Sequence, residues 1–304
     1  MWILKDVYLL SGFLGSGKTS LLTNLISQFK NEGIKPAVIM NELGKLAFDS
    51  RAVEEDIPLK EMLEGCICCT GSEKMEAQLQ MLLAGEDFDV LLIETTGAAH
   101  PVEALDAVFS PIFANQLNIK GIITVADCKR WLERDKLSPR TRMLFLEQIK
   151  HAHLIVANKV DLLTDDEIAT ASMELQGING DAPIIQASNS KISIKALANL
   201  EATFHEKEVK EAAIGKQLSL SSRLHTFNEP IDQEAFEDWV RGLPDSVYRM
   251  KGYVPLKGHK YPYLFQYAYG MIQWLPEYMK MEPQLVIIGE QINKLQIIGD
   301  SIND

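Results

Sequence analysis

A short apolar run that leads into a glycine-rich turn constrains the fold more than any other part of the chain. The run is Val7–Leu10, and the turn Gly12–Thr19 follows it with the sequence GFLGSGKT. Apolar residues then recur at helical spacing at Leu21, Leu22, Leu25, Ile26 and Phe29. This order predicts a buried strand, a tight turn and an α-helix that begins at Lys18.

The glycine-rich turn fits the pattern G-x-x-x-x-G-K-[ST], the phosphate-binding P-loop. Its glycines let the backbone bend so that N–H groups point at phosphate oxygens, and the helix dipole favours the same anion. Lys18 would reach the β- and γ-phosphates, and the Thr19 hydroxyl would hold Mg²⁺. The predicted nucleotide-binding set here is Gly12, Gly15, Ser16, Gly17, Lys18, Thr19 and Ser20. The alternative is a glycine-rich turn that binds no ligand.

Composition excludes several classes of protein. The formal net charge of −12 and the lack of a long basic stripe argue against a nucleic-acid partner. No run approaches the ~18 apolar residues that span a bilayer, and the first residues lead into a strand with no signal peptide, so no membrane partner is expected. Three of the 4 cysteines cluster at positions 66–69, which is not a disulfide framework. We therefore expect a cytoplasmic protein.

Apolar strands alternate with helices over residues 1–204. The expected strands after the first are Pro36–Met40, Val90–Ile93, Gly121–Ala126, Leu154–Ala157 and Pro183–Gln186. The expected helices after the first begin near Ser72 and cover Pro101–Phe109, Pro139–Ile149, Asp165–Leu175 and Ile194–Phe204. This alternation predicts an α/β fold, a P-loop domain with a mostly parallel sheet covered by helices on both faces.

The pattern changes in the last third of the chain. Residues 205–217 are charged and lack strand signals, so they read as a linker. Residues 218–304 form the second expected domain, in which the strands come in succession: Leu218–Phe227, Val247–Leu256, Tyr263–Tyr269 and Leu285–Ile288, with a helix over Asp232–Gly242. Successive strands favour a smaller α+β domain with an antiparallel sheet.

Asn158-Lys159-Val160-Asp161 forms an N-K-x-D tetrapeptide at the end of an expected strand, about 140 residues after the P-loop. A carboxylate at the position of Asp161 accepts two hydrogen bonds from guanine, one from the ring N–H and one from the exocyclic amine. Adenine offers no matching pair, so Asn158, Lys159 and Asp161 are predicted to select guanine nucleotides. The alternative is a solvated turn that caps the next helix.

Acidic residues follow two other expected strands. Glu94-Thr95-Thr96-Gly97 places an acid where it can hold Mg²⁺ and a glycine whose N–H can approach a γ-phosphate. Glu42 follows Pro36–Met40 and would relay nucleotide state or help to bind Mg²⁺; a capping or solvated acid is the alternative. His100 is either a ligand or a surface histidine.

Cys66-Ile67-Cys68-Cys69 is a second centre of chemistry. Three thiols within four residues suit Zn²⁺, or Co²⁺ or Cu⁺, and leave a coordination position open, as fits a metal that is meant to leave. Small buried residues or a redox pair of Cys68 and Cys69 are the alternatives. Cys128 is expected to be a packed core thiol rather than a ligand.

Taken in order, GFLGSGKT, GCICC, IETTG and NKVD resemble the CobW-type P-loop GTPases, and the resemblance spans nearly the whole chain. It implies a GTP-hydrolysing metallochaperone that holds zinc at Cys66, Cys68 and Cys69 and passes it to a client metalloprotein. It also assigns Glu94 to the hydrolysis machinery. Many members read E-N-E-F-G-E where this chain has Met40 and Lys45 at the two outer positions, so the resemblance does not carry over an auxiliary metal site that uses those two acids.

These observations predict a GTPase that loads Zn²⁺, with Co²⁺ as a second possibility, into a client protein. The predicted catalytic residues are Lys18, Thr19, Glu94 and Glu42. Two alternatives stay open: a GTPase whose cysteines sense redox state, and a scaffold for cobalt or corrin assembly.

Overall fold

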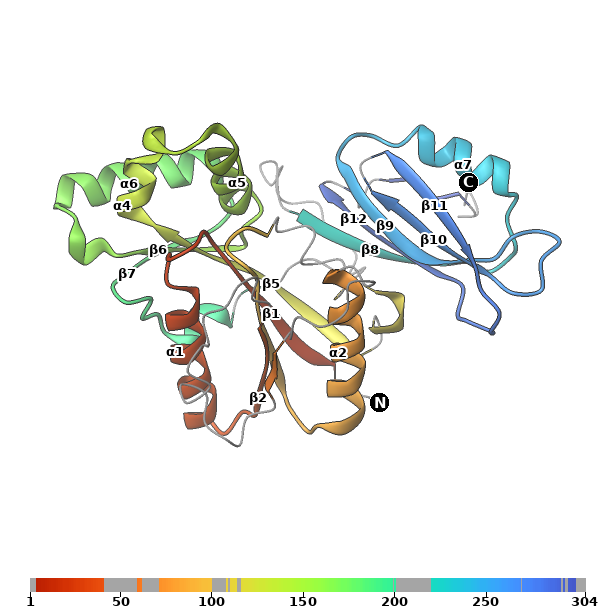
Figure 1. Cartoon of the computed structure of the whole chain (residues 1–304), viewed down its shortest axis with the longest axis horizontal. Coiled ribbons are helices and arrows are strands. Elements are labelled where there is room, and N and C mark those ends of the chain that lie inside the picture. Colours follow the sequence, from red (N-terminus) through yellow and green to blue (C-terminus); the bar gives the residue numbers. More distant parts are fainter. Residues whose placement is uncertain are drawn as a thin grey trace. The chain divides into compact units, whose positions relative to one another are not determined.

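The computed structural model describes residues 4–40, 59–61, 71–99, 108, 110–113, 116–198, 200, 220–268, 270–290, 292 and 295–298. The chain divides into two compact units (Figure 1). The first comprises Met1–Val108 and Gln116–Ala202, and the second comprises Phe109–Asn115 and Thr203–Asp304. A short segment from the middle of the sequence is thus part of the second unit.

The first unit is built on a seven-stranded sheet in which every neighbouring pair of strands is parallel. The order across the sheet is β3-β2-β4-β1-β5-β6-β7. The strands are β1 Lys5–Ser11, β2 Pro36–Met40, β3 Leu59–Glu61, β4 Val90–Glu94, β5 Leu117–Asp127, β6 Leu154–Asn158 and β7 Ile184–Ala187. Because β1 is central, the turn that follows it lies at the middle of the sheet's carboxyl edge.

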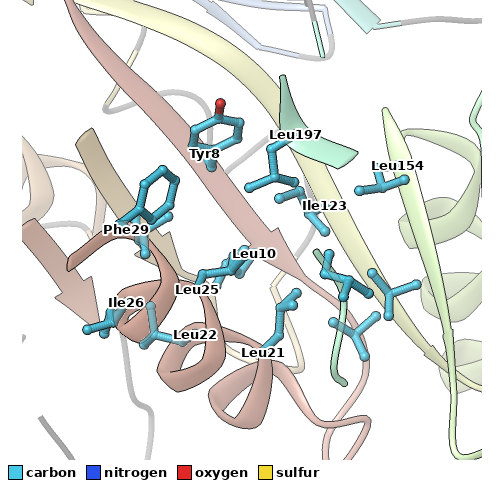
Figure 2. Close-up of a cluster of buried hydrophobic side chains, with 14 of the residues drawn as sticks. Tyr8, Leu10, Leu21, Leu22, Leu25, Ile26, Phe29, Ile123, Leu154 and Leu197 are labelled. Atoms are coloured by element: carbon cyan, nitrogen blue, oxygen red, sulfur yellow. The ribbon is translucent and has the colours of Figure 1, made fainter. Parts of the chain in front are cut away.

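Helices pack on both faces of this sheet. They are α1 Lys18–Asn31, α2 Gly71–Gly85, α4 Cys128–Leu132, α5 Pro139–Lys150 and α6 Asp165–Ile178, with 3₁₀ turns η3 Arg134–Lys136, η4 Val160–Leu162 and η5 Ile194–Leu197. On one face α1 buries Leu21, Leu25 and Phe29 against alternate residues of β1 and its neighbours (Figure 2). On the other, Phe145 of α5 and Trp131 of α4 pack edge to face, with ring centroids 5.5 Å apart. The expected two-sided parallel sheet is confirmed.

Three helices of the first unit begin just after a residue whose side chain caps the helix N-terminus. The Asp127 carboxylate accepts a hydrogen bond from the backbone N–H of Arg130 and so caps α4. Ser138 caps α5, which begins at Pro139. Thr164 forms a capping box with the α6 residue three positions later. Side-chain oxygens thus satisfy backbone donors that the first helical turn leaves open.

The second unit is a five-stranded antiparallel sheet with the order β11-β10-β9-β12-β8. Its elements are η2 Pro111–Phe113, β8 Leu220–Thr226, α7 Gln233–Arg241, β9 Val247–Val254, β10 Tyr263–Ala268, β11 Met271–Pro276 and β12 Gln284–Glu290. Phe236 of α7 packs edge to face on Phe265 of β10, with ring centroids 4.9 Å apart. The expected antiparallel sheet is confirmed, with one strand more than the sequence indicated, β11.

One predicted helix is wrong. Among the described residues of the helix expected over Ile194–Phe204, Ile194–Leu197 form a 3₁₀ turn, η5, and Ala198 and Leu200 are not helical. Leu197 and Leu200 are both buried in the core beneath α1, and the backbone N–H of Leu200 donates to the Leu197 carbonyl at 3.1 Å. Hydrogen bonds between residues three apart are those of a 3₁₀ helix, so the segment that buries this pair has 3₁₀ rather than α-helical bonding. Of the helix expected over Pro101–Phe109, only Val108 lies among the described residues.

Among the described residues, every helix is too short or too polar to traverse a lipid bilayer.

Candidate functional site

The turn between β1 and α1 has the backbone of a phosphate-binding loop. Gly12, Gly15 and Gly17 adopt φ values of 135°, 74° and 110°, which L-residues with a side chain rarely adopt. Space is also closed to side chains: a Cβ on Gly12 would lie 2.3 Å from the Val125 carbonyl oxygen, and one on Gly17 would lie 2.5 Å from Asn158 Nδ2. Gly12 and Gly17 are therefore required by both conformation and packing, and Gly15 by conformation alone.

Lys18 lies inside this turn rather than in solvent. Its side chain is buried, and Nζ donates to the carbonyl oxygens of Gly12 at 2.8 Å and Phe13 at 3.3 Å. Burial lowers the pKa of the Lys18 ammonium, and the nearby Glu94 carboxylate opposes that shift. The lysine is therefore held at the turn by backbone oxygens that a phosphate would replace as its partners.

Thr19 and Glu94 bring two oxygen ligands together. The Thr19 hydroxyl, at the start of α1, donates to Glu94 Oε1 at 2.9 Å, and Glu94 ends the neighbouring strand β4. A hydroxyl beside a buried carboxylate is the hard oxygen chemistry that Mg²⁺ prefers. The two residues thus fit the predicted magnesium site. Ser20, the last residue of the predicted phosphate set, is exposed on α1.

Gly97 lies against the tip of the P-loop. A Cβ added to Gly97 would come within 2.6 Å of the Leu14 backbone nitrogen and 2.8 Å of Leu14 Cα. The segment after Gly97 is held from behind by Gln148 of α5, a fully buried residue whose Nε2 donates to the Gly97 and Ala99 carbonyls at 3.3 Å each. The Gly97 backbone is therefore positioned beside the loop that would hold the phosphates.

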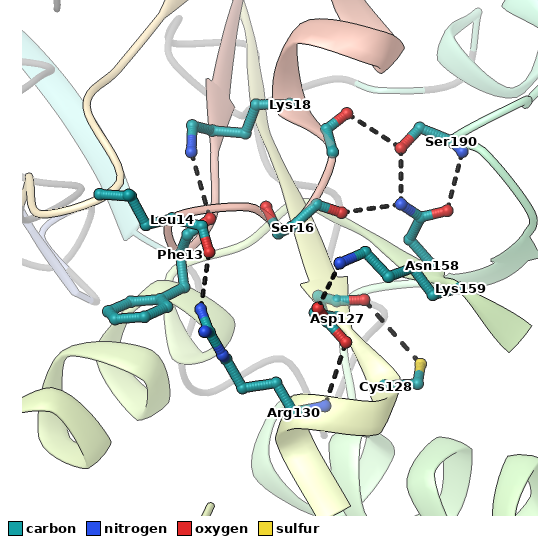
Figure 3. Close-up of polar contacts among 12 residues, drawn as sticks. Phe13, Leu14, Ser16, Lys18, Asp127, Cys128, Arg130, Asn158, Lys159 and Ser190 are labelled. Atoms are coloured by element: carbon teal, nitrogen blue, oxygen red, sulfur yellow. Dashed lines mark hydrogen bonds and ion pairs between the residues drawn. The ribbon is translucent and has the colours of Figure 1, made fainter. Parts of the chain in front are cut away.

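The N-K-x-D turn is hydrogen-bonded to the P-loop (Figure 3). Asn158, buried at the end of β6, donates through Nδ2 to the Ser16 carbonyl at 2.7 Å and to Ser190 Oγ at 2.7 Å. Ser190 Oγ in turn donates to the Gly17 carbonyl at 2.9 Å, and its backbone N–H donates to Asn158 Oδ1 at 2.8 Å. This network fixes the turn to the phosphate-binding loop.

The other two predicted residues of the N-K-x-D turn differ in exposure. Lys159 has a left-handed backbone, with φ of 64°, and its Nζ lies 2.6 Å from Asp127 Oδ2. Asp161 lies in η4 with an exposed side chain. An exposed carboxylate on a turn that is pinned to the P-loop is available to a base whose phosphates occupy that loop.

Several predicted residues fall outside the described part of the chain. They are Glu42, Cys66, Cys68, Cys69 and His100. Within the described ranges, no three His, Cys, Asp or Glu side chains gather as a metal site would need. Cys128 is buried in the core of α4 and α5, as expected, and burial beside Asp127 raises the pKa of its thiol to about 12.

The sequence did not indicate Ser190, Gln148 or Arg130, which all contact the P-loop or the Gly97 segment. Ser190 follows the end of β7, where side chains of parallel sheets meet a ligand, and that position is a usable signal. Gln148 and Arg130 lie on helices, 51 residues after Gly97 and 116 residues after Leu14, and no local pattern marks them.

Gly97→Ala is expected to reduce both folding stability and nucleotide turnover. The new methyl group would meet the P-loop backbone at 2.6 Å, so either Leu14 or the Gly97 segment must move, at a cost of about 1–3 kcal/mol. Denaturant unfolding and GTP hydrolysis measure the two effects. Gly177→Ala is the control, because a Cβ there meets no atom within 4 Å, and it should stabilise α6 by about 0.5–1 kcal/mol. Equal behaviour of the two variants would contradict the close approach.

A parallel sheet with a P-loop after its central strand and an N-K-x-D turn pinned to that loop defines a P-loop nucleotide-binding protein. Residues 6–186 match the CobW/HypB/UreG nucleotide-binding domain, and residues 220–300 match the C-terminal domain of the cobalamin synthesis protein cobW. The chain belongs to the CobW/HypB/UreG family.

The chain is similar to curated proteins and to a solved structure. The chain is 31% identical over 228 residues to zinc-regulated GTPase metalloprotein activator 1 of Dictyostelium discoideum. The aligned region covers 64% of this chain and 48% of that protein. The chain is 28% identical over 277 residues to the zinc chaperone YjiA of Escherichia coli, covering 86% and 85%. The crystal structure of Zn(II)-bound YjiA GTPase from E. coli superposes with a TM-score of 0.53 at 25% identity, covering 95% of both chains. The chain spans about half the length of several curated relatives that it matches.

Proposed function

We propose that this protein is a GTP-hydrolysing metallochaperone that carries zinc, or a similar divalent ion, to a client metalloprotein. The observation that carries the proposal is the attachment of the N-K-x-D turn to the P-loop through Asn158, with Thr19 and Glu94 meeting at 2.9 Å at the other end of the same loop. Base recognition, phosphate binding and metal-assisted hydrolysis thus have residues at one edge of one sheet.

Each residue of this edge has a role in the proposed reaction. Backbone N–H groups of the P-loop and the Lys18 ammonium bind the β- and γ-phosphates, and Asp161 accepts two hydrogen bonds from guanine. Thr19 and Glu94 would hold Mg²⁺, which neutralises charge on the phosphates when bound. Gly97 offers its N–H to the γ-phosphate, and Gln148 keeps that segment in place.

The cargo site is proposed on Cys66, Cys68 and Cys69, which lie outside the described residues. Support comes from the chemistry of three clustered thiols and from relatives named as zinc chaperones and a zinc-regulated metalloprotein activator. The cysteines and Glu42 fall in the sequence between β2, which ends at Met40, and α2, which begins at Gly71. Both of those elements belong to the sheet unit that carries the P-loop.

Nucleotide state is proposed to control metal affinity. Bound GTP orders the segments that carry Glu42 and Gly97, and this ordering brings the cysteine segment between them into a metal-holding form. Hydrolysis reverses the ordering and lets the ion pass to the client. The proposed arrangement comprises a GTPase domain over residues 1–204, a linker over 205–217 and a CobW-type domain over 218–304, in a cytoplasmic protein.

Zinc affinity measured with each nucleotide tests the proposal. A non-hydrolysable GTP analogue is expected to change the Kd for Zn²⁺ by about tenfold relative to GDP, a typical coupling between sites, and an ATP analogue should change it little. The Cys66→Ser, Cys68→Ser, Cys69→Ser triple variant should lose zinc, whereas Cys128→Ser should keep it because that thiol is buried in the core. Identical zinc affinities with GTP analogue and GDP would refute the coupling.

A further inference from the structure

Arg130, on the short helix α4, holds the tip of the P-loop from its carbonyl side. Its Nη1 donates to the Leu14 carbonyl at 2.7 Å, and its guanidinium carbon lies 5.1 Å from the centre of the Phe13 ring (Figure 3). Phe13 in turn packs on Phe145 of α5. Arginine therefore fixes two consecutive residues of the loop by a charge-assisted hydrogen bond and a cation–π contact.

Asp127 connects Arg130 to the turn predicted to recognise guanine. Asp127 Oδ1 accepts from the backbone N–H of Arg130 at 3.0 Å, and Oδ2 lies 2.6 Å from Lys159 Nζ. Asp127 is buried, so this carboxylate is a fixed point that joins the Lys159 ammonium to the backbone of Arg130. The contacts run without a break from Lys159 through Asp127 and Arg130 to Leu14.

The position of Leu14 determines which phosphate this chain of contacts affects. Leu14 is the P-loop residue that Gly97 approaches, since a Cβ on Gly97 would lie 2.6 Å from the Leu14 nitrogen. Gly97 is the residue proposed to face the γ-phosphate. In addition, the carbonyl that Arg130 binds belongs to the same peptide unit as the Gly15 N–H, so the positive charge polarises that donor toward an anion.

We propose that Arg130 is a positioning residue that sets the γ-phosphate end of the P-loop and makes it depend on the guanine-recognising turn. This inference rests on the proposed nucleotide function. Arg130 acts through Leu14 and Gly15 and needs no contact with the nucleotide. Loss of the guanidinium removes the polarising charge and frees Leu14 to move away from Gly97, so GTP loses more binding free energy than GDP does.

The test compares affinities for a non-hydrolysable GTP analogue and for GDP. Arg130→Ala is expected to weaken the analogue about tenfold, in the range of one coupling between sites, and GDP much less. Arg130→Lys, which keeps a cationic donor but loses the planar stack on Phe13, should give an intermediate ratio. If the alanine variant folds poorly, the lysine variant decides the question alone.

Arg134→Ala is a matched control. Arg134 follows one turn later and, like Arg130, donates to a backbone carbonyl and lies over an aromatic ring: the Trp131 carbonyl at 3.1 Å and the Trp131 ring at 4.3 Å. Its ion pair is with Glu174 of α6, and none of these three contacts involves the P-loop. It should leave the ratio of GTP-analogue to GDP affinity unchanged. An unchanged ratio in Arg130→Ala, or an equal shift in Arg134→Ala, would overturn the inference.

A double-mutant cycle tests the link to the guanine turn. Lys159→Ala should lower the ratio of GTP-analogue to GDP affinity in the wild-type background and have no further effect on that ratio once Arg130 is alanine. Fully independent effects would overturn the proposed dependence. Failure of the wild-type protein to bind guanine nucleotides would instead refute the proposed function itself, so the two failures are distinguishable.

Discussion

Lys18→Ala is expected to lower the rate of GTP hydrolysis by about 10²- to 10³-fold, the range found when one preorganised donor to a developing negative charge is removed. The buried ammonium already points at the carbonyls of Gly12 and Phe13, so it needs little reorganisation to meet a phosphate. Its absence leaves the γ-phosphate with backbone donors only. Single-turnover hydrolysis separates this loss of chemistry from any loss of binding.

Two further variants sharpen this result. Lys136→Ala removes an exposed lysine that pairs with Glu133 at 3.0 Å and should hydrolyse GTP at the wild-type rate. Lys18→Arg keeps the charge but introduces a larger planar group into a buried position, so it should not restore activity. Activity near wild type in Lys18→Ala would show that the buried lysine only supports the loop.

Sequence patterns located six of the seven strands of the parallel sheet because each of those contains a short apolar run. The strand β3, Leu59–Glu61, was missed because its sequence, LKE, contains no such run. The strand Pro36–Met40 has the predicted bounds, and its five residues are all buried. α4 was missed because five residues are too few to show a helical period, and its start depends on the Asp127 cap. β11 was missed because Met271 and Leu275, on its outward face, are as apolar as the inward Ile272 and Trp274.

The parts of the candidate site that consist of short motifs at the ends of strands were predictable from the sequence. GFLGSGKT, Glu94 and NKVD follow strands whose carboxyl ends meet, and the structure brings Thr19 to Glu94 and Asn158 to the P-loop. Their partners on helices were not predictable. Arg130 and Gln148 contribute by side-chain direction across more than 50 residues of sequence, which depends on how α4 and α5 pack on the sheet.

Asp161→Asn is expected to exchange guanine for xanthine specificity. The Asp161 carboxylate would accept two hydrogen bonds from guanine, and each bond to a charged group contributes about 1.5–3 kcal/mol, so the ratio kcat/KM for GTP should fall by roughly 10²- to 10⁴-fold. An amide can donate to the carbonyl that xanthine carries in place of the guanine amine. Hydrolysis of xanthosine triphosphate should therefore rise in the variant as hydrolysis of GTP falls.

The exposed position of Asp161 makes this exchange a clean measurement. The side chain lies in η4 on the surface, so the substitution should leave the unfolding free energy almost unchanged. Asp165→Asn removes the same charge from an exposed residue in the first turn of α6 and should retain the preference for GTP. The proposed recognition of guanine depends on the Asp161 carboxylate. If Asp161→Asn keeps its preference for GTP, the N-K-x-D turn does not select the base, and the proposed specificity for guanine nucleotides loses its basis.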